Sequence, residues 1–301
     1  MRDLTATSHD GIELAVRDYG GAGPDVLLLH GATRNLEDWG AVLPYLRGLR
    51  VVSMDQRFHG LSGVAPPTTS ADWVRDIETV IEALALSNPY LVGHSMGGVN
   101  ALLFGVEHPE CRGVLDIDGY DVRQPEFYDE LPTDRVRDFL DGVEARSGSF
   151  VPLDDEGDDE WHEQQVTVFE QMDQAWGIEP AVTQAVVGRA FVKTADGRWA
   201  RRPPGSFWGV AIADGATVDV IDLVRRASCP VTIVVCTKSV PVPPGRPAEF
   251  FAAGKRGVER HMRAIAAERP NVSAETIDAT HGVIHERPEE VGKLILALVS
   301  A

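Results

Sequence analysis

The chain has 301 residues, of which 44% are hydrophobic and 25% charged, a composition typical of a folded globular protein rather than a disordered one. Its formal net charge of −18 argues against nucleic acid or an anionic membrane as a partner. No stretch approaches the ~20 apolar residues of a membrane-spanning helix, and no apolar signal segment follows Met1. We therefore expect a cytoplasmic protein without a membrane span, built as one large domain with an insertion. Its oligomeric state stays open.

Apolar runs bounded by turn residues predict a series of short strands. The turn Asp10-Gly11 predicts that the first two strands form a hairpin, and an uninterrupted apolar run such as 26–30 is typical of a strand buried on both faces of a parallel sheet. Apolar residues at helical spacing predict amphipathic helices over 73–84 and 291–298. We expect strands at residues 4–8, 12–18, 26–30, 51–55, 89–92, 113–118, 231–235 and 272–277. Strands that alternate with helices predict an α/β fold with a doubly wound, mostly parallel sheet.

The segment from residue 120 to residue 215 interrupts this alternation. Its acidic run at 154–160 lacks the alternating ligand spacing of a calcium loop, so we interpret the run as a solvated loop and expect no metal there. We predict that residues 120–215 form an inserted, mainly helical lid over the C-terminal ends of the strands, and that residues 1–119 and 216–301 form the core. The segment is also rich in tryptophan, with Trp161, Trp176, Trp199 and Trp208.

Cofactor signatures are not found in the sequence. Cys111, Cys229 and Cys236 are widely spaced without a C-x-x-C pair, which favours buried, reduced cysteines over disulfides or a zinc site. No G-x-G-x-x-G follows the first strand of the predicted sheet, which argues against a dinucleotide. We expect a protein that works without cofactor or metal.

The most informative motif is Gly93-His94-Ser95-Met96-Gly97-Gly98, which fits the G-x-S-x-G pattern of a nucleophile elbow. It lies between a predicted buried strand and an amphipathic helix, where a sharp turn exposes the serine hydroxyl and leaves little room for neighbouring side chains. The N–H of Met96 would then lie at a helix N-terminus, where it stabilises developing negative charge. The motif predicts Ser95 as a nucleophile.

A serine nucleophile needs a base and a site for the oxyanion. His281 follows the last predicted strand and precedes the final helix, so we expect it to be the base. His285, four residues later, is expected to line the pocket or begin a helix. Ala32, after the strand that ends in His30-Gly31, would supply a second oxyanion N–H beside that of Met96.

These motifs together resemble the α/β-hydrolase fold superfamily, in particular its lid-bearing serine hydrolases of the esterase and lactonase type. The resemblance covers nearly the whole chain outside the predicted lid. It is carried by His30-Gly31, the elbow, the segment 281–288 and the pattern Asp55-x-Arg57-x-x-Gly60-x-Ser62, to which we assign a structural role.

The resemblance implies a carboxylate that orients the histidine. Its commonest place is the loop after the strand at 231–235, but residues 236–245 contain no carboxylate. The other place known in the superfamily is the end of the preceding strand, so we predict Asp118 as this acid. Asp116 and Asp121 are the next candidates, and a Ser95–His281 dyad without an acid is a further alternative.

Three functions follow from this constellation. The first is a serine hydrolase that cleaves a small-molecule ester, lactone or thioester. The second is the same fold with other chemistry, such as C–C bond hydrolysis, perhydrolysis or a biosynthetic cyclisation. The third is a small-molecule receptor with weak turnover. An epoxide hydrolase or a haloalkane dehalogenase is disfavoured, because both carry Asp where this chain has Ser95.

Overall fold

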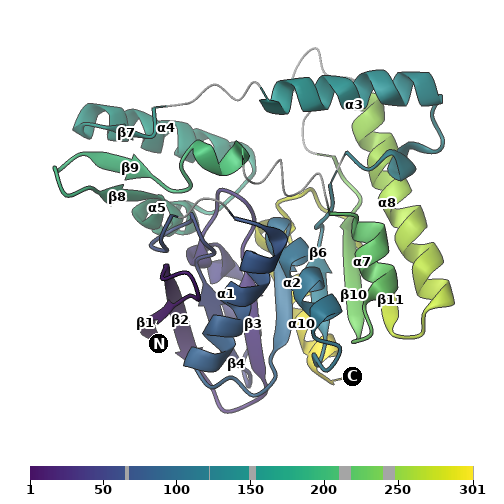
Figure 1. The fold of residues 1–301 in the computed structure, drawn as a ribbon, viewed down its shortest axis with the longest axis horizontal. Helices are drawn as coiled ribbons and strands as arrows, with labels where there is room; N and C mark the ends of the chain where they lie inside the picture. Colours follow the sequence, from purple (N-terminus) through teal and green to yellow (C-terminus); the bar gives the residue numbers. More distant parts are fainter. Residues whose placement is uncertain (65–67, 122, 149–153, 210–217, 240–247, 301) are drawn as a thin grey trace.

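An eight-stranded sheet forms the centre of the molecule in the computed structural model, which describes residues 1–64, 68–121, 123–148, 154–209, 218–239 and 248–300. The strands lie in the order β1-β2-β4-β3-β5-β6-β10-β11 (Figure 1). The pairs β1–β2 and β2–β4 are antiparallel and the others are parallel, which confirms the predicted mostly parallel sheet. The strands are β1 (Arg2–Thr7), β2 (Glu13–Gly20), β3 (Asp25–Leu29), β4 (Arg50–Met54), β5 (Tyr90–His94), β6 (Val114–Ile117), β10 (Val231–Cys236) and β11 (Val272–Ile277).

Helices cover both faces of this sheet. On one face lie α1 (Ser70–Ala83), α2 (Met96–Glu107), α7 (Val220–Arg226) and α8 (Ala248–Glu268), in front of the sheet in Figure 1. On the other lie η1 (Leu36–Ala41), η2 (Leu43–Tyr45), α9 (Val283–Glu286) and α10 (Pro288–Ser300). Every residue of β3 and of β5 is buried, because a central parallel strand is covered on both faces.

The segment between β6 and α7 departs from the sheet, and we call residues 120–215 the insert. Its elements are η3 (Pro125–Tyr128), α3 (Thr133–Gly148), β7 (Glu156–Gly157), α4 (Asp159–Ala175), α5 (Pro180–Ala190), β8 (Phe191–Lys193) and β9 (Trp199–Arg201). Strands β7, β8 and β9 form a separate small sheet in the order β7-β9-β8.

The two parts of the insert lie in different places (Figure 1). Helix α3 lies beside α8, where the rings of Phe139 and Phe250 stack at 4.5 Å between centroids. Helices α4 and α5 contact the loops that follow β3 and β4, through Arg34 and Asp173 of α4 at 2.7 Å and through Asp55 and Arg189 of α5 at 2.6 Å. Asn35 there donates from Nδ2 to the carbonyl of Val186 at 2.8 Å. The predicted boundary at 215 and 216 lies outside the described residues.

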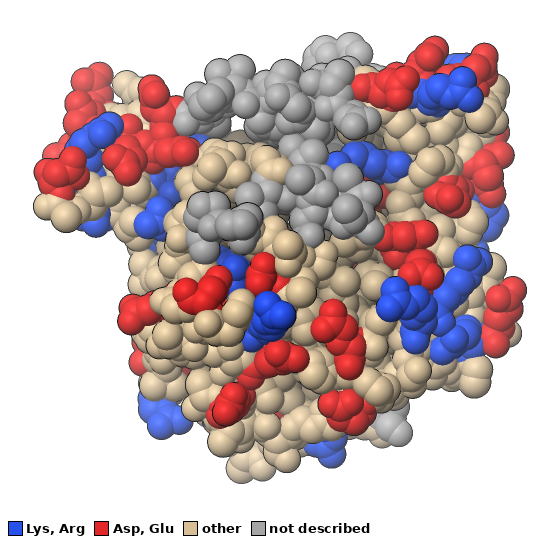
Figure 2. All heavy atoms as spheres, in the orientation of Figure 1, with Lys and Arg blue, Asp and Glu red and all other residues tan. Residues whose placement is uncertain are grey.

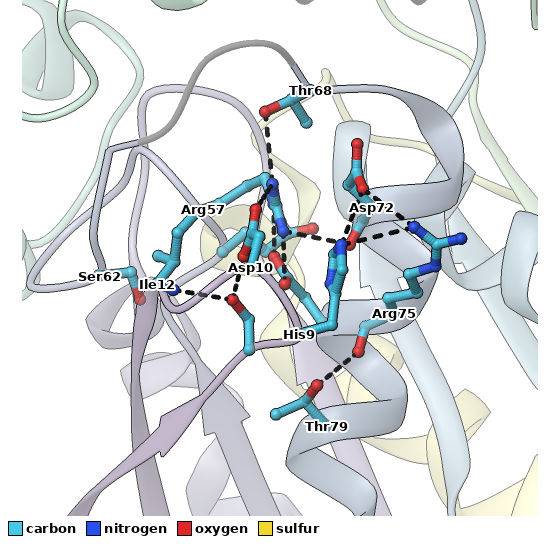
Figure 3. Close-up of polar contacts among 12 residues, drawn as sticks. His9, Asp10, Ile12, Arg57, Ser62, Thr68, Asp72, Arg75 and Thr79 are labelled. Carbon is cyan, nitrogen blue, oxygen red and sulfur yellow. Dashed lines mark hydrogen bonds and ion pairs between the residues drawn. The ribbon is translucent and has the colours of Figure 1, made fainter.

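Two buried side chains in the loop after β4, Asp55 and Arg57, connect this loop to neighbouring elements. Asp55 accepts hydrogen bonds from the backbone N–H groups of Leu36 and Leu61, both at 2.8 Å. Arg57 contacts Asp76 at 2.6 Å and Asp10 at 3.2 Å, and so links α1 to the hairpin turn (Figure 3). Both residues therefore have the structural role that the sequence pattern indicated.

The surface carries carboxylates dispersed among lysines and arginines, with no broad basic patch on the face shown in Figure 2. Within the described ranges, no helix is long and apolar enough to cross a membrane. The same residues contain no group of three or more metal-ligating side chains. All three cysteines are free and buried, in agreement with the sequence prediction.

Candidate active site

Ser95 lies at the turn between β5 and α2, with backbone angles of φ 55° and ψ −123°. A positive φ is uncommon for a residue other than glycine and marks local strain. The neighbouring glycines permit this turn, because a Cβ at Gly93 would overlap the backbone of Gly97, and one at Gly97 would overlap the carbonyl of Leu29. The sequence therefore folds here into an elbow that projects the serine side chain away from the sheet.

Three side chains from separate parts of the chain meet at this elbow. The Oγ of Ser95 lies 3.0 Å from Nε2 of His281, which stands in the loop between β11 and α9. The Nδ1 of His281 lies 2.7 Å from Oδ2 of Asp118, directly after β6. The structure thus brings together the predicted nucleophile, base and acid in one hydrogen-bonded chain.

Asp118 is fully buried, and several groups stabilise its charge. Burial opposes ionisation, but the hydrogen bond from His281, the charges of His281 and Lys255 and the N–H of Cys236 together hold the pKa of Asp118 below its ordinary value. The N–H of Cys236 donates to Oδ1 at 2.9 Å, and the Nζ of Lys255 lies 3.5 Å from Oδ2. Asp118 is therefore an ionised carboxylate that faces the imidazole.

The two other candidate acids lie elsewhere. Asp116 is buried beneath the elbow, where burial raises its pKa well above the ordinary value and the N–H of Gly119 donates to Oδ1 at 2.9 Å. Asp121 is ion-paired with Arg123. Neither Asp116 nor Asp121 is within hydrogen-bond distance of His281 in the described part of the chain.

The loop after β3 lies opposite the elbow, and a buried histidine holds it in place. With its proton on Nδ1, His30 donates to the carbonyl of Gly31 at 2.7 Å, and its Nε2 accepts from the N–H of Gln56 at 3.0 Å. Ala32 and Met96 both border the cavity that contains Ser95. Among the residues that the structure describes, no backbone carbonyl accepts from the N–H of Ala32 or of Met96.

Two cavities reach Ser95. The smaller, of about 110 Å³, is bordered by His281, His285 and the α4 side chains Met172 and Asp173. The indole of Trp176, at the end of α4, approaches His281 with 6.5 Å between ring centroids. The larger cavity, of about 300 Å³, extends the other way, to Val99, Leu103, Phe207 and Trp208. The insert therefore contributes to both cavities.

Several residues near the site were not expected from the sequence. Asp38 forms an ion pair with His285 at 3.0 Å and another with Arg34 at 2.6 Å. Burial alone would raise the pKa of Asp38, but the interactions with Arg34 and His285 have the larger effect, so this pKa lies below its ordinary value. Lys255 contacts the predicted acid from α8. No local pattern marks these residues, because each reaches the site from an element distant in sequence.

His94, within the elbow, is held by a hydrogen bond to the backbone of His281. Its Nε2 lies 2.8 Å from the carbonyl oxygen of His281, so it donates a hydrogen bond there. Burial, together with the nearby His281, lowers the pKa of His94 to about 3. His94 is therefore neutral and ties the backbone of the histidine loop to the elbow.

Comparison with known proteins agrees with this architecture. A model of the alpha/beta hydrolase family matches residues 26–294. The 2-(acetamidomethylene)succinate hydrolase of Mesorhizobium japonicum is 34% identical over 123 residues, which cover 40% of this chain and 44% of that protein. The non-heme haloperoxidase of Rhodococcus erythropolis is 32% identical over 105 residues, covering 34% and 38%. These matches span about two fifths of the relatives' length. The crystal structure of E-2-(acetamidomethylene)succinate hydrolase shares the fold, with a TM-score of 0.68 and 24% identity over 100% of this chain and 99% of that one.

Proposed function

This chain belongs to the alpha/beta hydrolase family, and from that premise we propose that it is a hydrolase that cleaves an ester, a lactone or a thioester through an acyl-enzyme on Ser95. The observation that carries the proposal is the continuous hydrogen-bonded chain from Asp118 through His281 to Ser95. A hydroxyl becomes a competent nucleophile when such a base accepts its proton.

The proposed reaction begins when Oγ of Ser95 attacks the substrate carbonyl and Nε2 of His281 accepts the hydroxyl proton. Asp118 holds the Nδ1–H tautomer and stabilises the imidazolium. His281 then returns the proton to the leaving alcohol or thiol, which leaves an acyl group on Ser95. Water, deprotonated by the same imidazole, releases the acid and restores the serine.

We assign the oxyanion site to the backbone N–H groups of Ala32 and Met96. Both residues border the cavity at Ser95, and Met96 begins α2, where the helix dipole favours negative charge. Each such donor contributes about 3–4 kcal/mol to transition-state stabilisation in serine hydrolases.

We further propose that the insert, residues 120–215, acts as a lid over a core formed by residues 1–119 and 216–301. The support comes from the residues of the insert that border the cavities at Ser95, among them Met172, Trp176 and Trp208. A cover of this kind excludes water and shapes the apolar walls that select the substrate.

The alternatives of C–C bond hydrolysis, perhydrolysis and cyclisation use the same three residues, and no described contact favours one of them. A receptor with weak turnover would be favoured if His281 had no acid beside it. The contact of 2.7 Å between Asp118 Oδ2 and His281 Nδ1 argues against this alternative.

Covalent labelling with a fluorophosphonate tests the proposal directly. We expect rapid labelling of the native protein and none of Ser95→Ala, with p-nitrophenyl esters, lactones and thioesters then used to rank substrates. His281→Ala should abolish labelling, while its matched control His285→Ala should retain most of it. Labelling that persists in Ser95→Ala, or a loss confined to His285→Ala, would contradict these assignments. Rapid labelling without turnover of any acyl substrate would favour the receptor.

A further inference from the structure

A third cavity, of about 220 Å³, lies within the insert and adjoins the two that reach Ser95. It shares Thr33 and Met172 with the smaller cavity and Trp208 with the larger one. Apolar side chains form much of its wall, including Val168, Phe169 and Phe191. A substrate whose carbonyl lies at Ser95 can therefore extend a second group into this cavity.

Two consecutive arginines border the third cavity, Arg201 at the end of β9 and Arg202 after it. Both are half-buried. In the described ranges, no carboxylate lies within 4.0 Å of either guanidinium group. Arg201 donates to the amide oxygen of Gln165, and Arg202 donates to the carbonyl of Arg201 at 3.4 Å. Neither contact neutralises a charge.

This arrangement differs from that of the arginines buried in or near the core. Arg34, Arg57 and Arg189 each contact a carboxylate at 2.7 Å or less. The carboxylates nearest the arginine pair are engaged elsewhere, since Asp155 accepts from the N–H of Gly205 at 2.5 Å and Glu156 pairs with Arg198 at 3.3 Å.

The arginine pair carries a cost that an anion would relieve. Burial lowers the pKa of both guanidinium groups, and the charges of Asp155 and Glu156 oppose that shift without forming an ion pair. Two consecutive arginines border one largely apolar cavity, and partly desolvated charge without a counter-ion is unfavourable, so the site is less stable empty than with an anion bound. In a chain of net charge −18, this local pair also offsets the field that repels anionic substrates.

We propose that Arg201 and Arg202 bind a carboxylate of the substrate, so that the enzyme acts on acyl compounds carrying a free acid group remote from the scissile carbonyl. This inference rests on the proposed function, because it places the reacting carbonyl at Ser95. It makes the arginine pair the specificity determinant of the site.

A carboxylate fits this cavity better than a phosphate does. Two guanidinium forks satisfy two carboxylate oxygens. A phosphate dianion has three free oxygens, and proteins usually satisfy them with additional backbone N–H groups at a helix N-terminus or nest. The N–H of Gly205, which borders the cavity, already donates to Asp155.

The test compares p-nitrophenyl hemiesters of adipate and suberate with the same compounds capped as methyl esters. We expect the native enzyme to prefer the free acid in kcat/KM. Arg202→Gln and Arg201→Gln should each lower the acid-to-capped ratio about ten- to a hundredfold, the range of a charge-assisted hydrogen bond. Arg198→Gln, which changes an exposed arginine directly before β9, is the matched control and should keep the ratio. Because each ratio is taken within one variant, partial unfolding does not change it.

A second measurement needs no turnover. Calorimetric titration of Ser95→Ala with suberate should show binding that Arg202→Gln in the same background weakens at least tenfold. If no ester is cleaved but this binding remains, the proposed function fails and the carboxylate site stands. If esters are cleaved with equal ratios in the native and Arg202→Gln enzymes, or phosphate binds more tightly than suberate, the carboxylate assignment is overturned.

Discussion

Substituting Asp118 by asparagine tests the site with a single change of charge. Asn fills nearly the same volume, and its amide oxygen can keep the hydrogen bond from the N–H of Cys236, now at 2.9 Å. The amide NH2 then faces Nδ1 of His281, at the position where Oδ2 now lies 2.7 Å away. Because an NH2 group cannot accept a hydrogen bond, His281 takes the tautomer with its proton on Nε2.

That tautomer places a donor opposite Oγ of Ser95, so the imidazole can no longer accept the serine proton. The corresponding substitution in a trypsin-type triad lowers kcat about 10⁴-fold, equivalent to about 5 kcal/mol of transition-state stabilisation. We expect a loss of the same order for Asp118→Asn. Lys255 also loses its counter-charge, but its Nζ keeps the hydrogen bond to the carbonyl of Cys236 at 2.9 Å, so the fold should persist.

The matched control is Asp116→Asn, the same substitution two residues earlier. Burial favours the neutral form of Asp116, and its Oδ1 accepts from the N–H of Gly119, a role that an asparagine oxygen can fill. Its kcat should fall less than tenfold. The assay is p-nitrophenyl ester hydrolysis with the rate of fluorophosphonate labelling, and thermal unfolding monitors the fold. Equal losses in the two variants, or less than a tenfold loss in Asp118→Asn with the fold intact, would refute this reasoning.

Two further predictions concern the smaller cavity. Trp176→Ala should widen it and raise kcat/KM for long acyl chains relative to short ones with little change in Tm, because Trp176 is 39% exposed and borders that cavity. Trp199→Ala, on the small sheet of the insert, is the control, and an equal shift there would contradict the assignment. Asp38→Asn should destabilise the protein by about 1–3 kcal/mol near neutral pH, since Arg34 and His285 lose the buried carboxylate that they contact, while Arg34 keeps its ion pair with Asp173 at 2.7 Å. The folded-state pKa of Asp38 lies below its ordinary value of 3.8, so this contribution is complete above that value and is lost as the pH falls below it. Urea unfolding from neutral to acidic pH measures it, and a pH-independent difference between native and variant protein would contradict it.

The parts of the molecule that the sequence predicted well are those set by local patterns. The elbow at Ser95 could be predicted because its tight turn leaves room only for glycine at Gly93 and Gly97. The strand predicted at 272–277 agrees residue for residue with β11. The arginine pair carries no such signal. Arg201 and Arg202 look like ordinary exposed cations in the sequence, and only the fold places them beside the α4 side chains Val168 and Phe169, away from any carboxylate partner among the described residues.

The placement of Asp118 shows where pattern reasoning succeeds and where it needs the fold. Residues two apart on a strand point to the same face, so the spacing alone gives Asp116 and Asp118 equal claims. The chain separates them by ending β6 at Ile117, so that Asp118 takes a positive φ of 54° and turns away from the strand direction. Asp116 stays beneath the elbow, where burial favours its neutral form, while Asp118 reaches His281, Lys255 and the N–H of Cys236. The pKa values of these two identical side chains are thus shifted in opposite directions because the strand ends between them, and the carboxylate at the sheet edge, whose charged form is favoured, is the one that contacts the imidazole.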